Sequence, residues 1–241
     1  MSIKKNFFYS TILTTANYVF PFLTYPYVSR ILGVEKIGMC NFADSIIHYF
    51  ILFSMLGISS VGIREIAKCQ NDKSLRSKVF SSLFCITAVS TLLALIILFI
   101  CTLLVPQLFQ YRILMGIGAL KILSNFLLVE WLFKGMEDFK YITQRTLIVK
   151  FLYVGSVFIF VKDESDYIVY YFLLTLMIMI NALINVLYAR KYISISFKCN
   201  WVVYIKPLII MWIYALLTNM YTTFNTSFLG FQSGEIHVGY F

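Results

Sequence analysis

Charged side chains are scarce in this sequence. Asp, Glu, Lys and Arg make up 13% of its 241 residues, against roughly 25% in an ordinary soluble domain. Only 11 residues are acidic, whereas 60% of the chain is hydrophobic and the mean hydropathy is +0.83. This composition excludes a soluble globular enzyme, a disordered chain and a disulfide-stapled secreted module.

Side chains that hold metals or carry out covalent catalysis are also few. The chain has five cysteines and two histidines, and no two cysteines form a C-x-x-C pair. A P-loop, an H-E-x-x-H motif and a G-x-S-x-G motif are absent as well. We therefore predict no disulfide framework, metal site, cofactor or enzymatic activity, and we do not expect ATP-driven transport by this chain alone.

Long apolar runs dominate what is present. A membrane-spanning helix needs about 20 mostly apolar residues, and seven such segments occur, of which five are free of charge and two carry one or two charged residues. They cover residues 6–29, 45–63, 79–111, 113–133, 146–161, 167–189 and 207–234. The first run is too long for a signal peptide, and Pro106 is expected to end the third helix. The sequence predicts an all-α integral membrane protein with about seven transmembrane helices.

The loop cations set the expected orientation, because Lys and Arg collect in cytoplasmic loops. One side of the predicted topology holds fourteen of them: Lys4, Lys5, Arg64, Lys68, Lys73, Arg76, Lys78, Lys134, Lys140, Arg145, Arg190, Lys191, Lys198 and Lys206. The other side holds four: Arg30, Lys36, Arg112 and Lys162. We therefore predict a cytoplasmic N-terminus. The net charge of +9 is spread over loops that face anionic lipid, so membrane lipids rather than nucleic acid are the expected partners.

Polar side chains recur at helical spacing inside several spans. They are Ser10, Thr14, Asn17, Pro21 and Thr24 in the first helix, Asn41, Asp44 and His48 in the second, Lys121, Ser124 and Asn125 in the fourth, and Asn219, Thr222, Thr223 and Thr226 in the seventh. Such stripes suit helices around a water-filled cavity. The alternative is that they form hydrogen bonds between neighbouring helices.

Ionisable groups in a span usually face the interior of the bundle. Lys121 lies deepest and is the strongest candidate, whereas Asp44 lies near the outer end of its span and His48 fits a packed, hydrogen-bonded histidine. Glu130 and Lys150 lie near the cytoplasmic ends of their helices, where they can reach the interface or pair with each other.

Four segments resemble one membrane-protein family in the right order. They are PFLTYPYVSRILGVEKIG (21–38), NFADSIIHYFILFSMLGISSVGIREIAK (41–68), VEWLFKGMED (129–138) and FNTSFLGFQSGEIHVGYF (224–241). The chain resembles the polysaccharide-biosynthesis flippases, the O-antigen and capsule repeat-unit translocases of the multidrug/oligosaccharidyl-lipid/polysaccharide exporter superfamily. Asn225 departs from the pattern, because the family commonly has aspartate there.

The resemblance implies two six-helix lobes. Residues 1–195 would then form the N-terminal lobe with helices one to six, and residues 196–241 a linker and helix seven, the start of a second lobe. The sequence therefore corresponds to the N-terminal part of such a protein, and the second lobe is either truncated or encoded separately. A separately encoded C-terminal half and a polysaccharide polymerase are the implied protein partners.

The implied cargo is an oligosaccharide repeat unit on undecaprenyl pyrophosphate, flipped across the bacterial cytoplasmic membrane without covalent chemistry. The expected substrate-binding residues are Arg30, Asp44, Arg64, Lys121 and Lys150. Arg30 and Arg64 match the family motifs, with interfacial anchoring as their alternative role. Two other functions stay open, a drug/cation antiporter of the same superfamily and a non-functional truncated remnant. An antiporter needs acidic groups in the cavity, and only Asp44 is a plausible one.

Overall fold

A computed structural model describes residues 3–194 and 200–240, apart from the side chains of residues 3 and 220–223. Every regular element in these ranges is a helix, which confirms the all-α prediction. The elements are α1 (Ile3–Met55), α2 (Ile58–Lys68), α3 (Lys73–Leu104), α4 (Pro106–Gln110), α5 (Arg112–Leu127), α6 (Glu130–Gly135), α7 (Phe139–Phe160), the 3-10 helix η1 (Glu164–Asp166), α8 (Tyr167–Ala189), α9 (Val202–Ser233) and α10 (Glu235–Tyr240).

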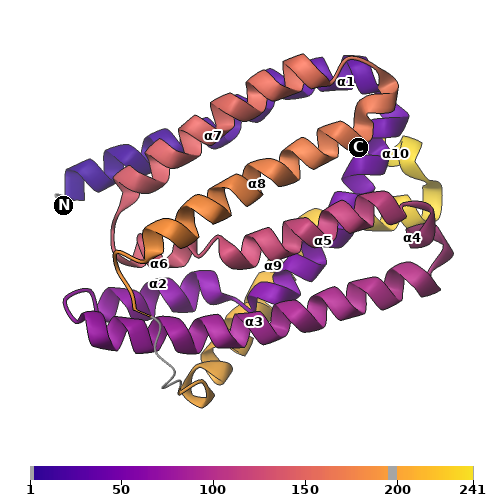
Figure 1. The fold of residues 1–241 in the computed structure, drawn as a ribbon. Coiled ribbons are helices and arrows are strands. Elements are labelled where there is room, and N and C mark those ends of the chain that lie inside the picture. Colours follow the sequence, from indigo (N-terminus) through magenta and orange to yellow (C-terminus); the bar gives the residue numbers. More distant parts are fainter. Residues whose placement is uncertain (1–2, 195–199, 241) are drawn as a thin grey trace.

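The described residues contain six segments long and apolar enough to cross a membrane, so the chain is a multi-pass membrane protein. The first of them, Lys4–Lys68, has 65 residues, enough for more than one crossing. Within it α1 bends at Gly33, whose φ of 70° and ψ of 170° suit only glycine. Figure 1 shows the first arm (residues 3–32) beside α7 and the second arm (residues 34–55) returning from the bend. The first arm covers the predicted span 6–29, and the second arm covers the predicted span 45–63 only as far as Met55.

Two predicted spans are interrupted where the apolar run gave no sign of a break. The second arm of α1 ends at Met55, and Leu56 and Gly57 take positive φ angles of 43° and 70°, so the predicted span 45–63 divides before α2. The predicted span 113–133 divides between α5 and α6, where Val129 has a φ of 37°. A hydropathy profile does not reveal such breaks, because apolar residues continue on both sides of them.

The other predicted spans agree more closely with the helices. α8 has the predicted bounds, and α3 ends one residue before Val105, so that Pro106 begins α4. The predicted boundary between residues 195 and 196, as well as Lys198, lies outside the described residues, and the division into two units stays a prediction.

The connections gather at two ends of the molecule. Figure 1 places the N-terminus, the α2–α3 turn, the α6–α7 connection and the end of α8 at one end. The Gly33 bend, α4, η1 and α10 lie at the other end. This is the grouping of loops that the cation count assumes. The first end, which carries the cation-rich connections, is called the basic end below.

The second arm of α1 lies at the centre of the packing. Phe42 and Ile47 of this arm are buried with Ile122 of α5 and Tyr171 of α8 in one apolar cluster. The short helix α10 packs on the same arm backbone to backbone, since a Cβ at Gly38 would lie 1.8 Å from the carbonyl oxygen of Glu235. The interior polar groups described below are therefore held by closely packed helices.

Candidate functional site

One candidate site is centred on Asp44, in the second arm of α1. Its Oδ1 accepts hydrogen bonds from Lys121 Nζ of α5 and, at 3.2 Å, from Tyr171 Oη of α8. The Lys121 side chain is 14% exposed and the Asp44 side chain 42% exposed, so the carboxylate is the open side of the ion pair. We call Asp44, Lys121 and Tyr171 the central site.

The central site combines two groups that the sequence proposed separately. A lysine in a transmembrane helix is costly unless it meets water or an opposite charge. A well-packed apolar pair would often stabilise a buried position as well as or better than an ion pair. The pair is therefore not explained by stability alone, which makes it a candidate for function.

His48 and Ser45 connect the second arm of α1 to α9. His48 Nε2 lies 3.0 Å from Asn219 Oδ1, and the hydroxyls of Ser45 and Ser227 are 2.9 Å apart. The hydrogen-bonded interpretation of His48 agrees with this contact. The side chains of Thr222 and Thr223, also proposed as cavity-lining, lie outside the described ones.

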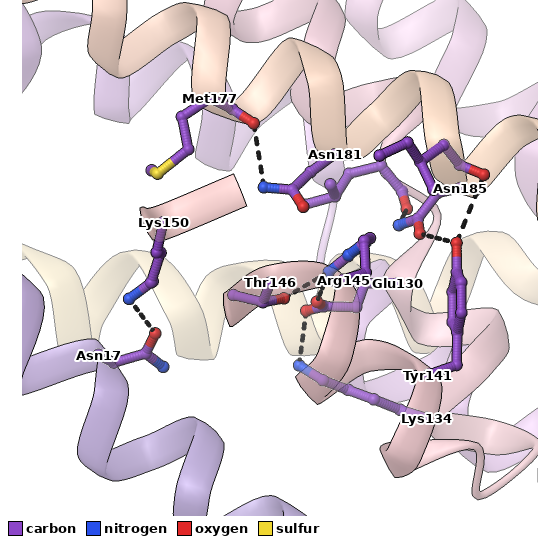
Figure 2. A network of polar contacts seen from close by, with 12 residues as sticks. Asn17, Glu130, Lys134, Tyr141, Arg145, Thr146, Lys150, Met177, Asn181 and Asn185 are labelled. Atoms are coloured by element: carbon purple, nitrogen blue, oxygen red, sulfur yellow. Dashed lines mark hydrogen bonds and ion pairs between the residues drawn. The ribbon is translucent and has the colours of Figure 1, made fainter. Parts of the chain in front are cut away.

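A second polar centre surrounds Glu130 at the start of α6. Figure 2 shows Arg145 of α7 and Lys134 of α6 converging on its carboxylate. Arg145 Nη2 donates to Glu130 Oε1 and to Thr146 Oγ1, both at 2.9 Å, while Lys134 Nζ lies 3.0 Å from Glu130 Oε2. The Arg145 side chain is 4% exposed, and its Nε and Nη1 have no partner among the described residues. We call Glu130, Lys134 and Arg145 the Glu130 triad.

The break between α5 and α6 presents Glu130 to the interior. It frees the backbone carbonyl of Leu128, which accepts from Asn185 Nδ2 of α8, and Asn185 Oδ1 accepts from Tyr141 Oη at 2.9 Å (Figure 2). Asn185 has no exposed surface. Backbone polar groups in hydrocarbon need partners inside the protein, and Asn185 satisfies that need at the break.

Lys150 is buried on α7 but does not pair with Glu130, so that predicted alternative is wrong. Its Nζ donates to Asn17 Oδ1 at 2.7 Å (Figure 2) and to the Ala16 carbonyl at 3.3 Å, both in the first arm of α1. Two neutral acceptors thus hold this ammonium. Asn17 belongs to the predicted polar stripe, whereas the Thr14 and Thr24 hydroxyls of that stripe donate to carbonyls of their own helix.

The start of α7 is fixed by Asp138, outside the spans. Its carboxylate caps the helix at the Tyr141 amide, 3.4 Å away, and accepts from the Tyr188 and Tyr192 hydroxyls at 3.0 and 2.6 Å. Burial, together with the hydrogen bond to Asp138, raises the pKa of Tyr192 well above its usual range, so this phenol stays protonated. The cap adds two turns to the predicted helix and brings Arg145 inside it.

Two adjoining hollows lie beside α2. One of about 290 Å³ is lined by Asn125, Glu130 and Lys134 among others, and one of about 270 Å³ reaches Thr218 and Asn219. They share Leu52, Met55 and Ser59. Open space with polar groups at both ends therefore extends from the Glu130 triad toward the His48–Asn219 contact. Among the described residues, no group of three or more His, Cys, Asp or Glu side chains is placed to hold a metal ion.

The remaining two candidates lie apart from these centres. Arg30 is exposed near the Gly33 bend, and Arg64 is exposed on α2, where its Nε lies 2.9 Å from Glu65 Oε1. They stand toward opposite ends of the molecule. Their positions fit interfacial anchoring, and their binding roles stay predictions.

Sequence reasoning missed Arg145, Tyr171 and Asn185 as interior residues. The sequence analysis places Arg145 among the loop cations because it precedes the predicted span 146–161, although Asp138 is a helix N-cap signal. For α8 the signal was a stripe of polar and small residues at steps of three and four, which marks helix–helix interfaces in membranes. The buried members of that stripe are Tyr171, Thr175, Ala182, Asn185 and Ala189.

Comparisons with known proteins cover nearly the whole chain. A family described as "Polysaccharide biosynthesis protein" matches residues 3–241. A protein of Escherichia coli (strain K12) named "Putative O-antigen transporter" is 29% identical over 166 residues, which is 69% of this chain and 40% of the relative. A Shigella dysenteriae protein of the same name is 26% identical over 245 residues, 99% of this chain and 61% of the relative. No solved structure gives a significant match.

Proposed function

This chain belongs to the polysaccharide biosynthesis protein family, and on that premise we propose that it serves to flip a lipid-linked oligosaccharide across the bacterial cytoplasmic membrane. The cargo would be a repeat unit on undecaprenyl pyrophosphate, and the N-terminus would face the cytoplasm. The names of the two relatives, which refer to O-antigen transport, support this cargo class. Transport of this kind needs binding and movement but no nucleophile, so we propose no enzymatic step.

The observation that carries the proposal is the pairing of Lys121 with Asp44 inside an apolar bundle. A pyrophosphate in transit must exchange its water for cations and hydrogen-bond donors. Lys121 can exchange the partly exposed carboxylate of Asp44 for a phosphate oxygen, because both are anionic acceptors of similar geometry. Asp44 then holds Lys121 whenever no cargo is bound.

The other proposed contacts follow from position. Lys150 is held only by neutral acceptors, so a phosphate can attract it without breaking an ion pair. Arg30 and Arg64, exposed toward the two ends, would meet the headgroup as it enters or leaves. A drug/cation antiporter would need a free acidic group, and the neutralisation of Asp44 by Lys121 speaks against that alternative.

Movement would require two bodies. We propose that residues 1–195 form one and that residues 196–241 belong to a second, which a separately encoded half could supply. The His48–Asn219 and Ser45–Ser227 contacts would lie between them. Transporters built from such units expose a central site alternately to each side by rocking one unit against the other.

Binding of undecaprenyl pyrophosphate to the purified chain in detergent tests the proposal. Lys121→Gln removes a charge-assisted contact and should weaken binding about 10-fold to 100-fold. Asp44→Asn removes the competing carboxylate and should tighten it. Lys162→Gln, in the exposed η1 connection, is the charge-matched control and should change little. Equal affinities for wild type, Lys121→Gln and Asp44→Asn, with folding checked by circular dichroism, would contradict the proposed role of the central site.

A further inference from the structure

The starts of α1 and α7 border an open basic hollow at the surface. It has a volume of about 300 Å³ and is lined by Lys4, Lys5, Phe8, Tyr9 and Lys140. No acidic side chain lines it. None of the three lysines forms an ion pair with a described carboxylate. Three ammonium groups thus border one small space without an anion to balance them.

The walls of this hollow are fixed by the fold. Thr143 of α7 is 2% exposed and its Oγ1 donates to the Tyr9 carbonyl at 3.0 Å, which holds the two helices together. Asn6 is 9% exposed and its Nδ2 donates to Glu137 Oε2 at 3.2 Å. Apart from Asp138, Glu137 is the acidic residue closest in sequence to Lys140. It is hydrogen-bonded to Asn6 and does not line the hollow. These two hydrogen bonds hold the backbone segments that carry the three lysines next to each other.

The surroundings of the hollow are those of a membrane surface. Phe7 and Phe8 are 73% and 62% exposed, so large apolar side chains stand next to the ammonium groups. Figure 1 places this region at the basic end, where the N-terminus lies beside the start of α7. Cations immediately beside apolar surface fit a ligand with an anionic head and hydrocarbon tails. Basic pockets between transmembrane helices bind lipid headgroups in this way.

We propose that this hollow binds the headgroup of an anionic diacyl phospholipid from the leaflet at the basic end. The headgroup phosphate would contact Lys4, Lys5 and Lys140, and the acyl chains would run down past Phe8. The lipid would join the first arm of α1 to α7 at the end where Thr143 and Asn6 already do so. This inference does not depend on the cargo, because it concerns a resident lipid outside the central site.

Phosphatidylglycerol binding, measured by native mass spectrometry of the purified chain, tests the inference, with zwitterionic phosphatidylethanolamine as the reference lipid. Each lysine near an anionic lipid contributes about 1 kcal/mol, a five-fold change in affinity. The triple variant Lys4→Gln, Lys5→Gln, Lys140→Gln should therefore bind phosphatidylglycerol roughly 100-fold more weakly. The wild type should bind it in preference to phosphatidylethanolamine and gain thermal stability from it.

The control is Lys73→Gln, Lys78→Gln, Lys206→Gln, which removes three exposed lysines elsewhere. It should keep affinity within about three-fold. Equal loss in both triple variants would mean diffuse surface attraction and would overturn the site, as would a wild type without preference for phosphatidylglycerol. Undecaprenyl pyrophosphate is titrated in parallel. If undecaprenyl pyrophosphate bound and phosphatidylglycerol did not, and the lysine triple variant lost that binding, the hollow would be a cargo site and the inference would be wrong. If the Lys121 and Asp44 variants bind undecaprenyl pyrophosphate as the wild type does, the proposed function fails, but the lipid site at the basic hollow still stands.

Discussion

The Glu130 triad offers a double-mutant cycle whose two arms should differ. Arg145 is almost fully buried, whereas the Glu130 side chain is 25% exposed and has a second partner in Lys134. Glu130→Leu therefore leaves a buried guanidinium without its carboxylate. Arg145→Met leaves a carboxylate that still has Lys134. Removing the acid should be the more harmful change.

The burial and distances give the expected sizes. Leaving a buried charge unpaired costs about 3 to 5 kcal/mol, which applies to Glu130→Leu. Arg145→Met removes the ion pair with Glu130 and the hydrogen bond to Thr146, together with a buried charge, and should cost about 2 kcal/mol. The double variant puts apolar groups of similar size in both places and leaves only the half-exposed Lys134 unpaired, for about 1 kcal/mol. The interaction energy, which is the difference between the double variant and the sum of the two single variants, should therefore be about 4 to 6 kcal/mol in magnitude.

The free energy of unfolding can be measured in mixed micelles of a mild detergent and SDS. Unfolding is followed by the fluorescence of the three tryptophans, one of which, Trp131, lies next to Glu130 in the sequence. Arg64→Met breaks the Arg64–Glu65 pair, whose arginine is 58% exposed, and as the matched control should cost less than about 1 kcal/mol. Additivity of the two triad variants within about 0.5 kcal/mol, or a larger loss from Arg145→Met than from Glu130→Leu, would refute the reasoning.

Three further predictions concern packing, hydration and topology. Gly38→Ala should destabilise the chain by about 1 to 3 kcal/mol in thermal unfolding, because its Cβ meets the Glu235 carbonyl, whereas Gly155→Ala has open space and should be neutral or stabilising; equal effects would contradict the α1–α10 contact. Lys121→Cys, in a background without native cysteines, should react with a water-soluble thiol reagent, and full protection would count against a hydrated site. A reporter fused at Lys73 should show a cytoplasmic location, and periplasmic activity there would contradict the predicted orientation.

Hydropathy predicted a chain of long apolar helices, because a lipid bilayer requires them. α8 has the predicted bounds since Asp166 and Arg190 flank an uncharged run that is long enough to cross. The break at Gly57 shows what hydropathy cannot contain. A Cβ at this position would lie 2.8 Å from the backbone of Met211 in α9. The turn at Gly57 depends on its contact with α9, which is far away in the sequence. The residues next to Gly57 are apolar and give no sign of this turn.

The candidate site was predictable in its residue types and not in its pairings. Lys121 and Asp44 were both proposed from their cost in a membrane, yet they are 77 residues apart and nothing local joins them. Tyr171 was hidden among the 17 tyrosines of the chain. Glu130 and Lys150 were near enough in sequence to suggest a pair, but the early start of α7 gives Arg145 to Glu130 and turns Lys150 toward Asn17. The sequence shows that a charged residue lies in a span, but the tertiary structure decides which group it pairs with.

The charge balance of the two polar centres and Lys150 bears on how an anionic cargo would be held. Four cations, Lys121, Lys134, Arg145 and Lys150, face two carboxylates, Asp44 and Glu130. These groups carry more positive than negative charge. Lys150 is hydrogen-bonded only to neutral acceptors, and two buried nitrogens of Arg145 have no hydrogen-bond partner among the described residues. Uncompensated charge in a low-dielectric interior costs free energy. Under the proposed function, a pyrophosphate with a negative charge on each phosphate supplies the missing anions, so the cargo would be stabilised by the same excess that burdens the empty protein. The carboxylates limit that attraction by competing for the cations, and this competition lets the cargo leave.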